Sequence, residues 1–275
     1  MTPPSLTIVI PAFNESGRLR STLPVLIGHV ADRDAEIIVV DDGSDDDTAP
    51  VAGAILGTVS GQVIRLPENR GKGAAIRAGV AAARGEAVLF MDADLATDLE
   101  ALPTVLKALE DADVVVGSRA VDGAIVYQGT WERALMGRAF NRMVRMLTRL
   151  EVHDTQCGFK ALRARVAKLL FAMSRVDGFA FDAEMLVYAR ILGFRIAEVP
   201  VVWTAVRGSS VRPVRDSAVT AWALLRIVLW ARPARVRALA EAHGWQPLVA
   251  HDGGLVPDRA KTNAAARRRR DGSAE

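Results

Sequence analysis

The sequence predicts an α/β fold in which a mainly parallel sheet is flanked by helices. In the first 118 residues, short apolar runs alternate with single segments whose apolar residues recur at helical spacing. Strands joined through single helices form right-handed crossovers, which make the sheet parallel. With 275 residues, of which 50% are hydrophobic, the chain can bury the core of one full domain.

The strand-like runs lie at 6–10, 36–40, 63–66, 87–91 and 113–116. The helical segments between them lie at 16–30, after Ser44, at 71–84 and in a stretch that ends near Glu110. Leu19, Leu23 and Leu26, for example, fall on one face of the first helix. Parallel sheets of this kind bind ligands at the carboxyl ends of their strands. The residues that follow each strand are therefore the candidates for a functional site.

Two further helical segments follow this region. The stretch 131–150 places Arg138, Arg142, Arg145 and Arg149 on one face, which is either a solvated face or a surface for phosphate or lipid headgroups. The stretch 217–231 is apolar nearly all round but too short to span a bilayer. It is a packed helix, a contact in a homodimer or a membrane-interfacial element.

The charge of the chain is concentrated at its end. Residues 258–275 carry six Lys or Arg against three Asp or Glu, which equals the net charge of +3. The rest of the chain is balanced, so no nucleic-acid partner is expected. We expect 212–252 to form C-terminal amphipathic or apolar helices, with a membrane-interfacial role as one option, and 253–275 to be a disordered basic tail.

Cys157 is the only cysteine, so no intrachain disulfide can form and a reducing compartment is favoured. The first residues lack the features of a signal peptide, and no apolar run reaches the roughly 18 to 20 residues that span a bilayer. We therefore expect a cytoplasmic protein that is peripheral at the cytosolic face of a membrane and not integral to it.

The strand-like run 87–91 ends in Asp92-Ala93-Asp94, a candidate metal site. Two acids one residue apart after a strand suit Mg²⁺ or Mn²⁺, because these hard cations take oxygen ligands and share them with phosphates. A turn or a helix cap is the alternative for such a pair taken alone. Asp41 and Asp42 follow the second strand-like run, so both acidic pairs could face one crevice. Their common placement favours the metal.

Gly71-Lys72-Gly73 lies between a strand and a helix, where phosphate-binding loops occur. It matches neither the P-loop pattern nor the glycine pattern of dinucleotide-binding folds. A nucleotide would therefore be held in another way, with Asp41 on the base or ribose and the metal on the diphosphate.

Five motifs, in this order along the chain, carry a resemblance to a known family. They are Ile10-Pro11-Ala12-Phe13-Asn14-Glu15, Val40-Asp41-Asp42-Gly43-Ser44, Asn69-Arg70-Gly71-Lys72-Gly73, Asp92-Ala93-Asp94-Leu95-Ala96-Thr97 and Gly117-Ser118-Arg119. Together they resemble glycosyltransferase family 2. Two more motifs are Asp154-Thr155-Gln156-Cys157-Gly158-Phe159-Lys160 and Phe181-Asp182-Ala183-Glu184. These narrow the resemblance to the dolichyl- or polyprenyl-phosphate sugar synthases, above all the dolichyl-phosphate glucosyltransferase branch.

The resemblance implies a GT-A fold that binds a nucleotide sugar and transfers its hexose, with inversion, to the phosphate of a polyprenyl lipid. It implies a catalytic domain at 1–211, with a nucleotide-binding half at about 1–118 and an acceptor half at about 119–211. The implied nucleotide-sugar-binding residues are Pro11, Phe13, Glu15, Asp41, Asp42, Lys72, Asp92 and Ala93. Asp92 and Asp94 would hold the metal. The implied catalytic residues are Asp94, Arg119 and Arg133.

An acceptor phosphate needs cations to position it more than it needs a base. Its second pKa of about 6 leaves it largely ionised at neutral pH. The resemblance assigns this role to Arg119 and Arg133, and the Ser209 turn with Arg212 is a further candidate. If the acceptor were a hydroxyl of a soluble molecule, Asp154 or Asp182 would be the base.

Ala96 stands where mannose-transferring relatives commonly carry a metal-ligating Gln, and this favours UDP-glucose as the donor. The Asp154 to Gly158 segment favours the same donor. Two alternatives stay open: a GDP-mannose-dependent polyprenyl-phosphate mannose synthase, and a family 2 transferase that acts on a soluble hydroxyl acceptor.

Overall fold

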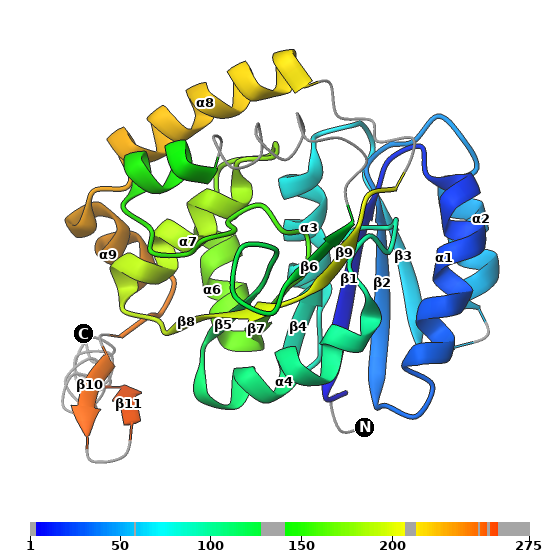
Figure 1. The fold of residues 1–275 in the computed structure, drawn as a ribbon, viewed down its shortest axis with the longest axis horizontal. Helices are drawn as coiled ribbons and strands as arrows, with labels where there is room; N and C mark the ends of the chain where they lie inside the picture. The colour runs from blue at the N-terminus through cyan, green and yellow to red at the C-terminus, as the bar shows by residue number, and fades with distance from the viewer. Residues whose placement is uncertain are drawn as a thin grey trace, which may run out of the picture.

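A computed structural model of the protein describes residues 4–57, 59–127, 141–206, 213–246, 248–251 and 254–257. A seven-stranded sheet forms its centre, with helices on both faces (Figure 1). The strands of this sheet are β1 (Leu6–Ala12), β2 (Ala35–Asp41), β3 (Gly61–Arg65), β4 (Ala87–Phe90), β5 (Val114–Ser118), β7 (Lys160–Arg163) and β8 (Ile196–Pro200). The helices are α1 (Ser16–His29), α2 (Thr48–Leu56), α3 (Lys72–Ala82), η1 (Leu99–Ala101), α4 (Leu102–Asp111), α6 (Ala164–Met173), α7 (Phe181–Leu192), α8 (Pro213–Trp230) and α9 (Pro233–Ala242).

The strand order is β3-β2-β1-β4-β7-β5-β8. Neighbouring strands are parallel except at β7, which is antiparallel to both β4 and β5. The predicted α/β class with a mainly parallel sheet and flanking helices is therefore confirmed.

The strands are apolar on both faces because helices cover both. Ile8, Ile10 and Val39 point into a core closed by α1, α2 and α4, whereas Val9 and Val40 point into a core closed by α3, α6, α7, α8 and α9. Continuous apolar runs are typical of strands that are buried on both faces. This explains why the runs in the sequence lack polar alternation.

The strand register brings the polar residues that follow the strands together at one edge of the sheet. Ala12 pairs with Asp41, so the turns after β1 and β2 begin side by side. Lys160 begins β7 between Phe90 of β4 and Val116 of β5. Because β7 runs in the opposite direction, its first residue lies at the edge where its neighbours end. The turns after β1, β2, β4 and β5 and the start of β7 therefore share one edge.

The C-terminal part departs from the sequence-based expectation in two places. The helix expected at 217–231 is present as α8, but it begins earlier, at Pro213. Strand β10 (Leu248–His251) lies in the segment 212–252 that we expected to be helical, and it pairs with β11 (Gly254–Pro257), which lies in the segment that we expected to be disordered. The rest of that tail, 258–275, lies outside the described residues. Of the arginine-rich stretch 131–150, residues 141–148 are helical and 131–140 lie outside the described residues.

The two remaining strands, β6 (Ile125–Tyr127) and β9 (Val202–Thr204), pair in parallel beside the main sheet. Helix α8 lies across the end of the molecule opposite the N-terminus, over α7 (Figure 1). None of the helices in the described ranges is long and apolar enough to cross a bilayer.

Candidate active site

A cleft of ≈ 630 Å³ opens beside the turn that follows β1. Phe13, Glu15 and Arg18 line it, together with Asp94 from the turn after β4. Glu15 forms an ion pair with Arg18 at 2.5 Å. Burial raises the pKa of Glu15, and the nearby Asp94 carboxylate raises it further, against the lowering effect of Arg18. The predicted nucleoside-binding segment therefore lies beside the predicted metal pair.

Hydrogen bonds join the turns after β1 and β2 into one unit. The backbone N–H of Asn14 donates to Ser44 Oγ at 2.9 Å, and that of Asp45 donates to Asn14 Oδ1 at 2.9 Å. Asn14 has a φ of 55°, a left-handed conformation that asparagine tolerates better than most residues. These hydrogen bonds fix the position of the turn after β1, whose residues Phe13, Asn14 and Glu15 line the cleft.

Asp41 is fully buried at the end of β2, and its two oxygens have different partners. Its Oδ1 accepts a hydrogen bond from the Ser44 N–H at 2.9 Å. Its Oδ2 forms an ion pair with Arg65 Nε at 3.4 Å but accepts no hydrogen bond from the described residues. Because a buried oxygen without a donor is costly, Asp41 is suited to accept a hydrogen bond from a ribose or a base. The contact of Asp41 with a nucleotide stays a prediction.

Asp42 has a different use, which sequence reasoning did not separate from that of Asp41. Its two oxygens accept hydrogen bonds from the backbone N–H groups of Arg70 and Gly71, at 2.9 and 2.7 Å. Gly71 has a φ of 106°, which favours glycine, and it directly precedes α3. Asp42 therefore holds the loop that presents Lys72, and its direct contact with a nucleotide stays a prediction.

Asp92 and Asp94 differ in their partners. The Lys72 ammonium forms an ion pair with Asp92 Oδ1. Burial acts to raise the pKa of Asp92, but the charge of Lys72 outweighs it, so the pKa is lowered. Asp94 Oδ1 accepts one hydrogen bond, from the Ala96 N–H at 3.0 Å. Burial, reinforced by the charge of Asp92, raises the pKa of Asp94.

The pair fits a divalent cation. A cation beside Asp94 would relieve the unfavourable burial of its negative charge. The described residues contain no group of three or more His, Cys, Asp and Glu that could enclose a metal. Mg²⁺ is usually held by one or two carboxylates and completed by substrate phosphates and water. Two aspartates beside an open cleft match that pattern.

Arg119, which follows β5, is held by a bidentate contact with Asp154. Its Nε and Nη2 donate to the two carboxylate oxygens at 2.7 and 3.0 Å, and its backbone N–H donates to Oδ2 at 3.0 Å. The guanidinium also lies 5.2 Å from the centre of the Trp203 ring. Burial acts to raise the pKa of Asp154, but the contacts with Arg119 outweigh it and lower the pKa to about 2. Asp154 is therefore an anchor for Arg119 and a poor base.

Lys160 and Asp182 form a second buried pair beneath Asp92. Lys160 Nζ donates to Asp182 Oδ1 at 2.6 Å and also to the Cys157 carbonyl. Both side chains are almost inaccessible, at 0% and 5% exposure. The charge of Lys160 contributes to the lowered pKa of Asp92. Asp182 is thus a nearly buried counter-ion of Lys160, and burial raises its pKa above the usual value, against the lowering effect of Lys160.

The sequence was compared with models of known protein families. The model of the family described as Glycosyl transferase family 2 matches residues 7–171. The chain belongs to glycosyltransferase family 2. This confirms the resemblance that the motifs carry, and the protein is a glycosyltransferase with a GT-A fold.

Several relatives share most of its length. The dolichyl-phosphate beta-glucosyltransferase of Drosophila melanogaster is 36% identical in an alignment 226 positions long, which covers 76% of this chain and 69% of the relative. The human protein of the same name is 35% identical over 226 residues, covering 76% and 70%. Glucosyl-3-phosphoglycerate synthase of Mycobacterium tuberculosis, solved with Mn²⁺, UDP and glucosyl-3-phosphoglycerate, aligns with a TM-score of 0.60 at 23% identity. That alignment covers 83% of this chain and 80% of the synthase, and it supports the fold.

The structure brings together most of the predicted site residues of this glycosyltransferase. Pro11 lies in β1 directly before the cleft, and Ala93 is buried between the two aspartates. Three predicted residues, Arg133, Ser209 and Arg212, lie outside the described residues, so their roles stay predictions.

Sequence reasoning missed Lys160 and Trp203 as parts of the site. Lys160 is a lysine at the first position of an apolar strand, and such a residue requires a buried counter-ion. That signal was present in the sequence, but its partner Asp182 was not predictable from spacing. Trp203 contacts Arg119 from β9, a strand that the sequence pattern did not suggest.

Substitution of Gly158 should disturb the metal pair. A Cβ at this position would lie 2.1 Å from Asp92 Oδ2, closer than any real contact. We expect Gly158→Ala to displace the carboxylate and to lower kcat by about 10- to 100-fold, because small displacements of catalytic groups have effects of this size. Gly28→Ala is the matched control, since a Cβ at Gly28 meets no atom within 4 Å. Equal turnover of both variants would show that Asp92 does not need its observed position.

The Asp154 carboxylate makes folding stability depend on pH. Its folded pKa, about 2, lies below the usual value of 3.8, so its contribution is fully present above about pH 4 and is lost as the pH falls toward 2. The contribution is about 2 kcal/mol. Urea unfolding of the wild type and Asp154→Asn should therefore show a difference in unfolding free energy that shrinks between pH 4 and 2. A difference that is independent of pH would contradict this assignment.

Proposed function

We propose that this protein transfers the glucosyl group of UDP-glucose, with inversion, to the phosphate of a dolichyl or other polyprenyl phosphate. The names of relatives that are 34–36% identical over most of the chain support this acceptor. The observation that carries the proposal is the state of the two candidate bases. Asp154 is ion-paired with Arg119 and Asp182 with Lys160, whereas Asp94 faces the open cleft. Such a site suits an acceptor that arrives already ionised.

The reaction forms one bond and breaks one. A phosphate oxygen of the acceptor attacks C1 of the glucosyl group, and the bond from C1 to the UDP oxygen breaks with its electron pair on UDP. No proton has to leave the attacking oxygen. Mg²⁺ or Mn²⁺ at Asp92 and Asp94 would stabilise the negative charge that develops on the departing diphosphate.

The chain supplies the remaining positive charge. Asp154 engages Nε and Nη2 of Arg119, so Nη1 can contact a phosphate oxygen. Lys72 pairs with Asp92 at the same edge of the sheet. A metal on the aspartates would leave the Lys72 ammonium able to contact the diphosphate. Arg133, Ser209 and Arg212 remain further candidates for the acceptor phosphate.

A panel of donors tests the sugar. The protein is incubated with Mg²⁺ or Mn²⁺, polyprenyl phosphate and radiolabelled UDP-glucose or GDP-mannose, and label is counted in the solvent-extracted lipid. Label from UDP-glucose is the expected result. Label from GDP-mannose alone would support the mannose synthase instead, and label confined to water-soluble products would support a soluble acceptor.

We further propose that α8 lies on a membrane surface. Its described outer side exposes Trp222 and Leu229, at 63% and 62%, and Met146 of the 141–148 helix is 70% exposed. Arg226 and Arg232 are exposed on and directly after α8. Apolar side chains rimmed by arginines are typical of peripheral contact with anionic lipids. In this proposal 1–211 is the catalytic domain and 212–252 the interfacial segment, on the cytosolic side.

Sedimentation with vesicles of anionic or neutral lipid distinguishes this contact from a homodimer. Binding that weakens when Trp222 and Leu229 are replaced by Ser supports the membrane. A dimer in size-exclusion chromatography that the same change dissociates would assign this surface to a second copy.

A further inference from the structure

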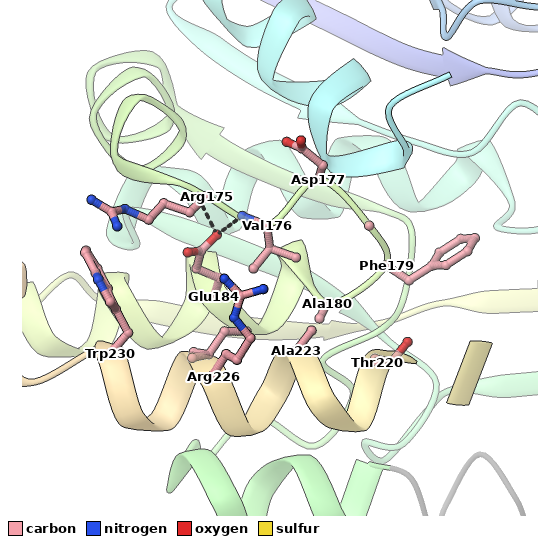
Figure 2. A pocket seen from close by; sticks show the side chains of 12 residues that line it. Arg175, Val176, Asp177, Phe179, Ala180, Glu184, Thr220, Ala223, Arg226 and Trp230 are labelled. Atoms are coloured by element: carbon pink, nitrogen blue, oxygen red, sulfur yellow. Dashed lines mark hydrogen bonds between the residues drawn. The ribbon is translucent and has the colours of Figure 1, made fainter. Parts of the chain in front are cut away.

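A second pocket, of ≈ 510 Å³, lies between α8 and the segment 175–180 that precedes α7 (Figure 2). Its lining shares no residue with the nucleotide-side cleft. Val176, Ala180, Ala223, Ile227 and Trp230 give it mainly apolar walls. The volume is within the roughly 300 to 1,000 Å³ of sites that enclose small molecules. The pocket is therefore large enough for an apolar ligand.

Glu184, which lines this pocket, needs no cationic ligand to balance its buried carboxylate. Glu184 accepts hydrogen bonds from Ser174 Oγ at 2.6 Å, from the backbone N–H groups of Arg175 and Val176 at 2.9 Å, and from the Tyr188 hydroxyl at 2.8 Å. Its two oxygens are thus satisfied within the protein, as Figure 2 shows for the backbone donors. Glu184 therefore fixes the backbone at the start of the 175–180 segment, and the other lining residues determine which ligand the pocket can bind.

Two arginines supply that chemistry. The Arg175 guanidinium lies 4.2 Å from the centre of the Trp230 ring, and Arg226 extends from α8 toward the 175–180 segment (Figure 2). Among the residues that the structure describes, neither guanidinium has a carboxylate partner. An apolar pocket whose two guanidinium groups have no carboxylate partner among the described residues is complementary to an amphiphile with an anionic head. Guanidinium groups bind phosphate through charge-assisted, bidentate hydrogen bonds.

The pocket is joined directly to the catalytic edge. The Asp177 carbonyl accepts the Gly73 N–H at 2.7 Å, at the start of α3, and the Asp177 carboxylate contacts Arg77 at 2.8 Å. A Cβ at Gly71 would lie 2.6 Å from the Asp177 carbonyl oxygen, so the two backbones touch. Lys72, which lies between these glycines, pairs with Asp92. The loop at Gly71–Gly73 therefore contacts the pocket wall through Asp177 and the predicted metal pair through Lys72.

We propose that this pocket binds the isoprenyl units next to the phosphate of the lipid acceptor, and that Arg175 and Arg226 attract the phosphate as the lipid enters. The inference rests on the proposed function and assigns its acceptor chain to a place in the fold. The exposed apolar side of α8 forms the outer face of the same helix whose inner face lines the pocket. A lipid can thus pass from a bilayer around α8 toward Lys72.

Filling the pocket tests the inference. Gly178 lines it, and a Cβ there meets no atom within 4 Å, so Gly178→Leu adds apolar volume without a backbone clash. Ala223→Trp fills it from α8, and Ala238→Trp on the exposed side of α9 is the matched control. With farnesyl phosphate as acceptor, the two filling variants should raise KM by about 10-fold or more, because several buried methylenes lose their site. KM for UDP-glucose and the Tm should stay as in the control.

Two outcomes overturn the inference. One is a KM for farnesyl phosphate that is unchanged in both filling variants while the wild type transfers glucose. The other comes from a farnesyl phosphate analogue that carries a photoreactive group on its chain. We expect it to label 175–180 or 220–230, and labelling confined to other peptides would contradict the pocket. A wild type that transfers no glucose to farnesyl phosphate would refute the proposed function separately, and the labelling would still decide where the chain binds.

Discussion

Replacement of Asp94 by Asn should lower kcat for sugar transfer by about 10²- to 10³-fold, because a metal held by Asp92 and Asp94 would stabilise the leaving diphosphate by several kcal/mol. Asp94 faces the cleft, and burial together with the charge of Asp92 raises its pKa, which indicates a negative charge that lacks a cation. The amide keeps the shape of the side chain but removes that charge. The rate should therefore fall while the Tm stays the same or rises.

The measurement is initial-rate kinetics with increasing Mn²⁺, combined with titration of Mn²⁺ binding in the presence of UDP. Asp98→Asn is the matched control, because Asp98 is exposed and only caps η1 through the Glu100 N–H. If Asp94→Asn retained the wild-type rate and Mn²⁺ affinity, the metal would have to lie elsewhere.

Loss of the Arg119 fork should have the second-largest effect. We expect Arg119→Lys to lower kcat/KM by about 10²-fold, because a lysine cannot hold Asp154 and a phosphate oxygen at the same time. Asp154→Asn should lower it less, through the loosened position of Arg119. The combination of the two should be no slower than Arg119→Lys alone.

That double-mutant cycle separates an anchor from a base. If Asp154 removed a proton from the acceptor, its substitution would multiply the loss from Arg119→Lys. It would also abolish the acidic limb of the pH–rate profile. Non-additive effects and an unchanged profile are the results expected of a residue that acts through Arg119.

The apolar strands and the acidic pair after β4 could be recognised in the sequence because both signals are local, and the binding of a metal by this pair stays a prediction. An apolar strand followed by Asp92-Ala93-Asp94 can be recognised from a few consecutive residues. The alternation of strands and helices then places these aspartates at the carboxyl ends of the parallel strands. The same holds for Asp41, which is the last residue of the apolar strand β2.

The ion pairs were not predictable because they depend on long-range topology. Asp154 and Asp182 looked like candidate bases, but β7 enters the sheet antiparallel and places Lys160 against Asp182. The segment before β7 carries Asp154 to Arg119 in the same way. No spacing rule relates these residues, which are separated by 22 and 35 positions. Similarly, the difference between Asp41 and Asp42 appears only when the loop before α3 is in place.

The most direct test of the central claim compares two acceptors that differ only in the phosphate. Radiolabelled UDP-glucose and Mg²⁺ are supplied with either a polyprenyl phosphate or the polyprenol of the same chain length. A site whose cations position a phosphate, and in which Asp154 and Asp182 are held by Arg119 and Lys160, should transfer label to the phosphate and none to the alcohol. Equal labelling of the alcohol would contradict the account, since it would require a base that neither Asp154 nor Asp182 can provide.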